Sequence, residues 1–317
     1  MRSSVRKVYV LFFVLTFLFA AGISALCGIT AVSHYDAEKG FLEKSLIPDL
    51  LLPVFLLTFA ALCLTAFLFL SRKIRRFSLP LTPALRAFSL LGTLAFLFWF
   101  ISYGTDFAKG LYASCPLLLN IAFPLLSLGI FFLFAAVALK ANASLCAIGS
   151  MAAAVFAAVY AVYVRFEPFF AIHHPVKMFD QFTFIVLSLY FFFFFRYHLG
   201  FGNGAFYFPA AMFAAVLTSA DGLSGLLYFA VKGEPLLCRV AHDVLLFALS
   251  LYLFARLASV FHRESSADTA DPYALEFAVS RKSDETVPEP SLQEEEKEAG
   301  DGKDGEKRGT EEDAFRI

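Results

Sequence analysis

Three ionisable residues, Arg239, His242 and Asp243, lie close together in the apolar stretch LLCRVAHDVLLF (236–247). Residues i and i+4 share one face of a helix, so Arg239 and Asp243 are placed to pair, with His242 at their side. A charge near the middle of a bilayer costs about 3 kcal/mol or more, and one that is retained there commonly serves a ligand, an ion or a proton. This stretch is therefore a candidate binding site.

Asp221 is the second candidate, in the polar stretch TSADGLSG (218–225). Counted from Ala205 at ~1.5 Å per residue, it lies ~24 Å along a helix, inside or at the edge of a ~30 Å hydrocarbon core. Its glycine and serine neighbours favour a break in the helix, as at the ligand sites of transporters. The alternative is a helix that ends at Ser219, with Asp221 in an outer loop and the following LSGLLYFA as a re-entrant or surface segment.

A third group of ionisable residues, His173, His174, Lys177 and Asp180, lies in the stretch AIHHPVKMFDQF (171–182), whose proline favours a helix start. One interpretation joins all three groups in an outward-facing polar pocket. The other is an ordinary outer interface, where long charged side chains reach water at little cost and the charges of the 236–247 stretch neutralise each other. The predicted ligand-binding residues are Asp221, Arg239, His242, Asp243, Asp180, His173 and His174.

The elements that would position these groups are membrane spans. The chain of 317 residues is 59% hydrophobic and only 17% charged, whereas roughly a quarter of the residues in a soluble domain are charged. Eight apolar runs approach the ~20 residues that cross a bilayer as a helix. They cover residues 8–30, 49–70, 86–104, 116–139, 144–165, 181–196, 205–230 and 236–261. We therefore expect an all-α polytopic membrane protein with about eight transmembrane helices. Seven is the alternative, because the sixth run is short and the seventh is interrupted.

The distribution of Lys and Arg predicts the orientation. With eight spans and the N-terminus inside, the inner segments hold 12 Lys and Arg and the outer segments hold 7. The dense run SRKIRR (71–76) resists translocation most strongly, so both termini should be cytoplasmic. The short loops favour a bacterial cytoplasmic membrane as the location.

The charge balance reverses near residue 262. Residues 1–262 carry 18 Lys and Arg against 10 Asp and Glu, whereas residues 263–317 carry 8 against 17. The second part is too poor in aliphatic side chains to offset chain entropy, which predicts a disordered acidic tail behind a transmembrane domain. Acidic charge also argues against a nucleic-acid partner and leaves a cytoplasmic protein as the partner that the tail could contact.

An internal duplication is a further hypothesis. The segments PLLLNIAFPLLSLG from Pro116 and PLLCRVAHDVLLFA from Pro235 are similar, and a Lys-Gly pair precedes each. This pattern fits two four-helix halves of the same orientation, whereas chance similarity between apolar segments of low complexity is the alternative.

Sequence motifs for soluble chemistry are absent. The chain contains no GxxxxGK[ST], HExxH or GxSxG motif, no CxxC pair and no Cys/His metal spacing. We therefore expect neither a cofactor nor a metal, and any enzyme activity would have to be an intramembrane hydrolase or transferase that uses His and Asp.

Two functions remain. The first is a permease-like or solute-binding membrane component, whose partners are the lipid bilayer and a small solute or ion. The alternative is a non-catalytic membrane scaffold or sensor that acts through its cytoplasmic tail.

Overall fold

The computed structural model describes residues 3–36, 41–42, 45–73, 79–112, 117–166, 175–233 and 237–260. All of them belong to one compact unit, Met1–Phe277, and the predicted tail (263–317) lies outside the described residues. The long helices are α1 (Ser3–Ser33), α2 (Leu52–Lys73), α3 (Pro83–Ala108), α4 (Leu117–Ala138), α5 (Ala143–Tyr163), α6 (Pro175–Arg196), α7 (Gly204–Lys232) and α8 (Leu237–Ser259). The short elements are the antiparallel pair β1 (Tyr35–Asp36) and β2 (Phe41–Leu42), the π-helical turns η1 (Ile47–Leu51) and η3 (Tyr197–Phe201), and the 3-10 turn η2 (Val164–Phe166).

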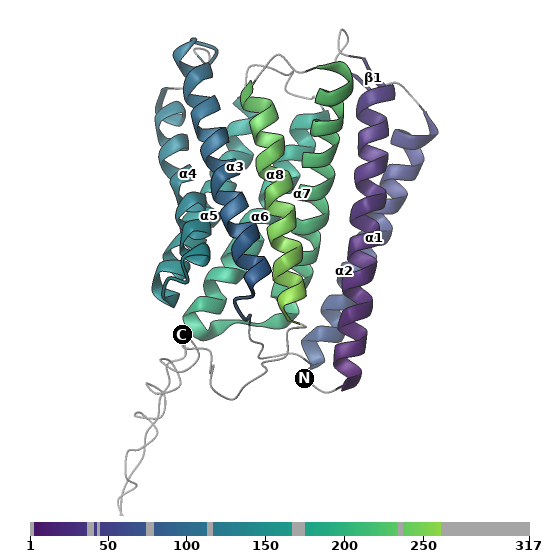
Figure 1. Ribbon diagram of the computed structural model, residues 1–317. Coiled ribbons are helices and arrows are strands. Elements are labelled where there is room, and N and C mark those ends of the chain that lie inside the picture. The colour runs from purple at the N-terminus through teal and green to yellow at the C-terminus, as the bar shows by residue number, and fades with distance from the viewer. Residues whose placement is uncertain are drawn as a thin grey trace, which may run out of the picture. The chain divides into compact units, whose positions relative to one another are not determined.

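Within the described ranges, eight helices are long and apolar enough to cross a membrane. Their outward faces carry exposed large apolar side chains, among them Leu57, Ile101, Leu118 and Ile148, which a soluble monomer rarely presents in such number. The prediction of an all-helical chain with eight helices long and apolar enough to span a membrane is confirmed. α1 begins and α8 ends at the same end of the bundle (Figure 1), and which end faces the cytoplasm stays a prediction.

The sixth and seventh spans correct two sequence expectations. The sixth is not short, because α6 and η3 together give an apolar segment of 25 residues, Lys177–Phe201. The seventh is neither broken at Asp221 nor ended at Ser219, because α7 runs without interruption to Lys232. Its hydroxyl groups bond within the helix, as where Thr218 Oγ1 donates to the Ala214 carbonyl at 2.7 Å, so polar residues do not interrupt it.

Side-chain caps fix where three of the helices begin. Thr82 accepts a hydrogen bond from the Leu85 N–H at 3.2 Å before α3, and Asn142 accepts one from the Leu145 N–H at 3.1 Å before α5. Asn203 accepts the Ala205 N–H at 3.0 Å before α7. Each cap satisfies one of the N–H groups that a helix leaves unpaired in its first turn, which an apolar surrounding would otherwise penalise.

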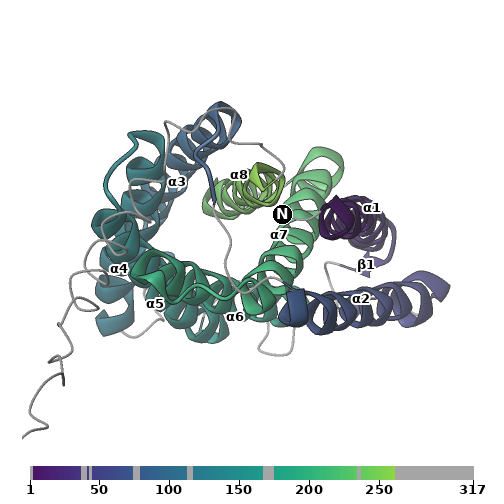
Figure 2. The ribbon, with the colours of Figure 1, turned by 90° about the horizontal axis from the view of Figure 1, so that it is seen from below.

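Six helices form a closed ring in which each packs against the next. α3 packs on α4, α4 on α5, α5 on α6, α6 on α7, α7 on α8, and α8 back on α3. Figure 2 shows this ring along the helix axes, with α1 and α2 outside it against α7. Of the most apolar stretch of α7, 61% is buried, against 17% for α2. The interior of the ring is therefore the place where buried polar groups can be screened from lipid.

The packing does not follow two equivalent four-helix halves. Equivalent halves would match the α1–α7 contact with an α5–α3 contact, and the α3–α8 contact with an α7–α4 contact. In the described part of the chain, the α1–α7 and α3–α8 contacts are extensive and neither expected counterpart is comparable. The similarity of the segments that begin at Pro116 and Pro235 is not reflected in the fold.

Gly222 allows α7 and α8 to approach each other closely. A Cβ atom at this position would lie 2.6 Å from the Phe247 backbone nitrogen and 2.8 Å from the Asp243 carbonyl oxygen. Real Cβ atoms do not come so near to backbone atoms, and helix backbones cannot yield as a flexible side chain does. The contact between these two helices therefore requires a glycine here.

We expect Gly222→Ala to destabilise the protein by ~1–3 kcal/mol, because overpacking forces the two helix backbones apart. Gly104→Ala in α3 is the matched control, since a Cβ there would meet nothing within 4 Å. Thermal unfolding of both variants in the same detergent checks this. Equal melting temperatures for the two variants would contradict the assigned contact.

Candidate functional site

A buried ion pair joins α6 to α8 inside the ring. Asp180 on α6 is 0% exposed, and its Oδ2 accepts a hydrogen bond from Arg239 Nη1 at 2.7 Å while Oδ1 accepts one from Nη2 at 3.3 Å. The two parallel bonds use the fork of the guanidinium, which is the strongest geometry available to such a pair. Both residues were among the predicted site residues, but the sequence predicted Asp243 as the partner of Arg239. In the structure Asp180 is the nearer partner.

Asp243 and His242 extend this pair along α8. Asp243 Oδ1 lies 3.8 Å from Arg239 Nε and 3.5 Å from His242 Nδ1, and it has no hydrogen-bond partner within the described ranges. The Asp243 carboxylate packs against Gly225 of α7, where a Cβ atom would overlap it. The His242 ring lies against both Tyr160 and Phe184, with ring centroids 5.5 and 5.7 Å apart, and neither of its nitrogens has a hydrogen-bond partner among the described residues.

Asp221 approaches the same group from α7. It is 4% exposed, and its carboxyl group is close enough to that of Asp180 for a hydrogen bond. The charged groups of Arg239 and Asp243 act on it from α8, and the Cys27 thiol lies near it on α1. Its Oδ2 has no partner within the described residues. Two carboxyl groups from different helices therefore meet in the interior, beside one arginine.

Further charged groups surround this cluster. Lys177 is buried one turn before Asp180 on α6. Asp106 on α3 is also buried, and its Oδ2 accepts the backbone N–H of Cys238 at 3.2 Å while its Oδ1 lies 3.4 Å from Lys109 Nζ. Asp106 thus satisfies an N–H group in the first turn of α8 from a neighbouring helix, which fixes the position of Arg239.

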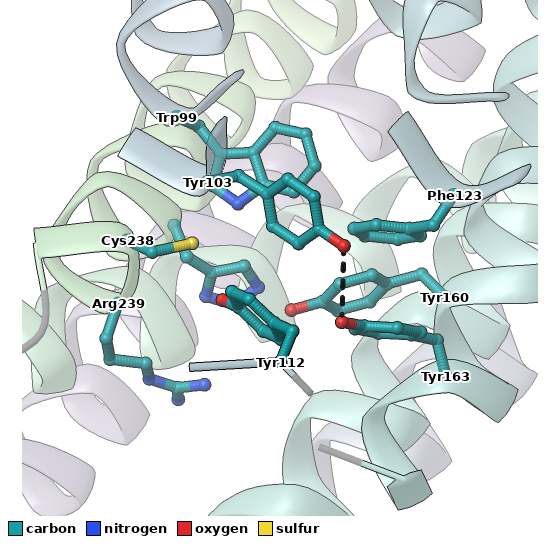
Figure 3. A pocket seen from close by; sticks show the side chains of 9 residues that line it. Trp99, Tyr103, Tyr112, Phe123, Tyr160, Tyr163, Cys238 and Arg239 are labelled. Carbon is teal, nitrogen blue, oxygen red and sulfur yellow. Dashed lines mark hydrogen bonds between the residues drawn. The ribbon is translucent and has the colours of Figure 1, made fainter. Parts of the chain in front are cut away.

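An aromatic cavity adjoins the ion pair. Its lining consists of Trp99, Tyr103, Tyr112, Phe123, Tyr160, Tyr163, Cys238, Arg239 and His242. Figure 3 shows Cys238 and Arg239 on one side and Tyr160, Tyr163 and Phe123 on the other, with the hydroxyls of Tyr103 and Tyr163 3.5 Å apart. The cavity measures about 10 Å³, roughly the room that one water molecule needs. A larger solute would require the ring to open.

A metal ion does not fit the described groups. Although Asp180, Asp221, Asp243 and His242 lie in one region, no three His, Cys, Asp or Glu side chains in the described residues converge closely enough to hold one. The arrangement can instead bind, hold or pass a proton, because carboxyl and imidazole groups do this without a fixed coordination shell.

The structure brings together five of the seven residues that the sequence proposed: Asp180, Asp221, Arg239, His242 and Asp243. The other two, His173 and His174, lie outside the described residues. Burial of Asp180 and Lys177 also argues against an ordinary outer interface at this point. The sequence analysis did not predict the aromatic lining. The signal that could have indicated it is the pair Tyr160 and Tyr163, two tyrosines three residues apart in an alanine-rich helix.

Comparison with known proteins adds no family to this description, because no protein-family model, curated protein or solved structure matches the chain. The site is therefore interpreted from its own geometry.

We expect Arg239→Gln to destabilise the protein by ~3–5 kcal/mol, because the variant leaves the Asp180 carboxylate buried without its partner. The double variant Asp180→Asn/Arg239→Gln should recover part of the loss, with a coupling energy of ~1 kcal/mol or more. Chemical unfolding in detergent measures both effects in one double-mutant cycle.

Lys109→Gln is the matched control, because Lys109 is 66% exposed in its pair with Asp106 and exposed pairs contribute at most ~1 kcal/mol. Additive effects of the Asp180 and Arg239 substitutions would show that the two side chains are not coupled.

Proposed function

We propose that this protein is a proton-coupled membrane transporter, in which Asp221 and Asp180 bind and release the coupling proton. The observation that carries the proposal is the contact between these two buried carboxyl groups. Two ionised carboxylates in contact repel each other strongly, so such a pair keeps one proton in a low-dielectric surrounding. Ionisable groups inside a membrane bundle are costly, and proton relays are among the functions that retain them.

The charge balance supports a proton at this site. Three carboxyl groups, Asp180, Asp221 and Asp243, lie near one permanent cation, Arg239, and one histidine. Arg239 can neutralise only one of these carboxylates, and no three His, Cys, Asp or Glu side chains of the described residues are placed to hold a metal ion. A proton shared by Asp221 and Asp180 removes one further negative charge. Asp221 Oδ2, which has no hydrogen-bond partner among the described residues, is the atom where the proton would enter or leave.

The small cavity supports an occluded form of such a transporter. Arg239 and His242, both in contact with the carboxyl cluster, line it together with aromatic side chains of α3, α4 and α5. Room for about one water molecule allows a proton to pass but holds no solute. In this proposal the solute enters when the ring opens at the end where α8 begins. The distribution of Lys and Arg predicts that this end faces the outside of the membrane. This is the outward-facing polar pocket of the permease hypothesis.

Asp221→Asn should abolish proton coupling, because the amide has almost the same shape but cannot release a proton. The measurement is lumenal acidification in liposomes that contain the purified protein and the pH dye pyranine. Each run uses an imposed membrane potential and a panel of amino acids, carboxylates and sugars. We expect at least one solute to drive proton entry through the wild type, and a loss of about tenfold or more in the variant.

Lys109→Gln serves as the control and should keep wild-type flux, because that lysine is exposed and pairs with Asp106, not with Asp180 or Asp221. The proposal fails if the folded wild type moves no protons with any solute, or if Asp221→Asn moves them equally fast.

The scaffold alternative rests on the acidic tail, with 17 Asp and Glu against 8 Lys and Arg in residues 263–317. Removal of residues 264–317 separates the two functions. A transporter should keep its proton flux within about twofold of the full chain, since the charged residues of the site, from Asp180 to Asp243, all precede the removed segment. If truncation abolishes flux while the melting temperature is unchanged, the tail takes part in the activity and the transporter proposal must be revised.

A further inference from the structure

A second buried charge lies at the opposite end of α8. Arg256 is 2% exposed and lies in the last turn of the helix, at the end of the bundle where α1 begins (Figure 1). Its guanidinium carbon is 4.7 Å from the centre of the Phe194 ring and 6.0 Å from that of Tyr252. This position is separate from the carboxyl cluster at the start of α8.

Arg256 has no counter-ion in the described part of the chain. No carboxylate there lies within ion-pair distance of it, and its Nε and Nη1 atoms are buried without hydrogen-bond partners. The contact with the Phe194 ring stabilises the positive charge but satisfies none of its N–H donors. Burial of a guanidinium with unsatisfied N–H donors costs free energy, so we expect a negatively charged hydrogen-bond acceptor at this point.

Other polar groups lie near the guanidinium. His198 of η3 is buried next to Phe194, and neither ring nitrogen has a hydrogen-bond partner in the ranges that the structure describes. The Tyr252 hydroxyl lies near Arg256 but forms no well-aligned hydrogen bond. The hydroxyls of Tyr190 and Tyr207, which lie 3.4 Å apart, interact electrostatically with the Arg256 guanidinium. N–H and O–H groups from α8 and η3 therefore share one region that contains no acidic partner in the described residues.

We propose that Arg256, with Tyr252 and His198, binds an oxyanion of the phosphate type at this end of the ring. The guanidinium fork matches two oxygens of such a group. A tetrahedral anion presents its remaining oxygens in other directions, as donors from different elements require, whereas a carboxylate offers acceptors in one plane only. Free phosphate and the phosphate of a phospholipid headgroup carry this chemistry. The proposal is independent of the proton-coupled function, because it uses none of the residues of the carboxyl cluster.

The first test uses the purified full-length protein and inorganic phosphate as the probe. Melting temperatures are compared in sodium phosphate and in sodium chloride at equal ionic strength and pH. We expect phosphate at ten times its dissociation constant to raise the wild-type melting temperature by about 2–4 °C, because it binds only the folded state. The shift should vanish in Arg256→Met.

Three further variants keep the test independent of folding. Arg86→Met replaces an exposed arginine that donates to the Ala138 carbonyl, so it should keep the full shift. Tyr252→Phe removes only the unused hydroxyl and should weaken phosphate binding by about tenfold. Arg256→Lys keeps the charge without the fork and should also bind more weakly. If Arg256→Met does not fold, the Tyr252 and Arg256→Lys variants decide.

The second arm tests the lipid source by native mass spectrometry of the protein in detergent. Retention of a phospholipid by the wild type and Arg86→Met, with loss in Arg256→Met and Arg256→Lys, identifies a headgroup as the bound phosphate. A phosphate shift without lipid retention identifies the free anion. The proposal is overturned if neither effect is seen in the wild type, or if both persist unchanged in the Arg256 and Tyr252 variants.

Discussion

The ion pair between Asp180 and Arg239 sets the arrangement of the bundle interior. A charge that is enclosed by helices must be neutralised where it lies, because transfer of an ion out of water costs several kcal/mol. The two hydrogen bonds of 2.7 and 3.3 Å tie α6 to α8 in one orientation. Asp106 fixes the start of α8 from α3 through the Cys238 N–H. Together these contacts hold Arg239 where it can interact with Asp243 and Asp221 as well.

Small residues complete this positioning from α7. Gly222 lets the α7 backbone approach α8, and Gly225 leaves room for the Asp243 carboxylate. Asp221, on the same helix, is thereby carried to Asp180. The interior charges and the close helix packing thus depend on each other: without the glycines the carboxyl groups would separate, and without Arg239 their charge would not be compensated.

α8 carries two chemically different environments at its two ends. Near its start, carboxyl groups outnumber the permanent cations, which suits a group that takes up and releases protons. Near its end, Arg256 lies among tyrosine, phenylalanine and histidine side chains with unused donors, which suits an anion.

The sequence by itself predicted an all-helical chain with about eight long apolar helices and singled out five residues that the structure brings together, because apolar length and the cost of charge in lipid are local properties of the chain. It misjudged α7, since the stretch around Asp221 reads as a break unless the packing of Gly222 on α8 is known. It could not select Asp180 over Asp243 as the nearer partner of Arg239, nor gather the aromatic lining from α3, α4 and α5. Those decisions depend on which helices are neighbours in the ring, and contacts between residues far apart in the chain arise only when the bundle is assembled.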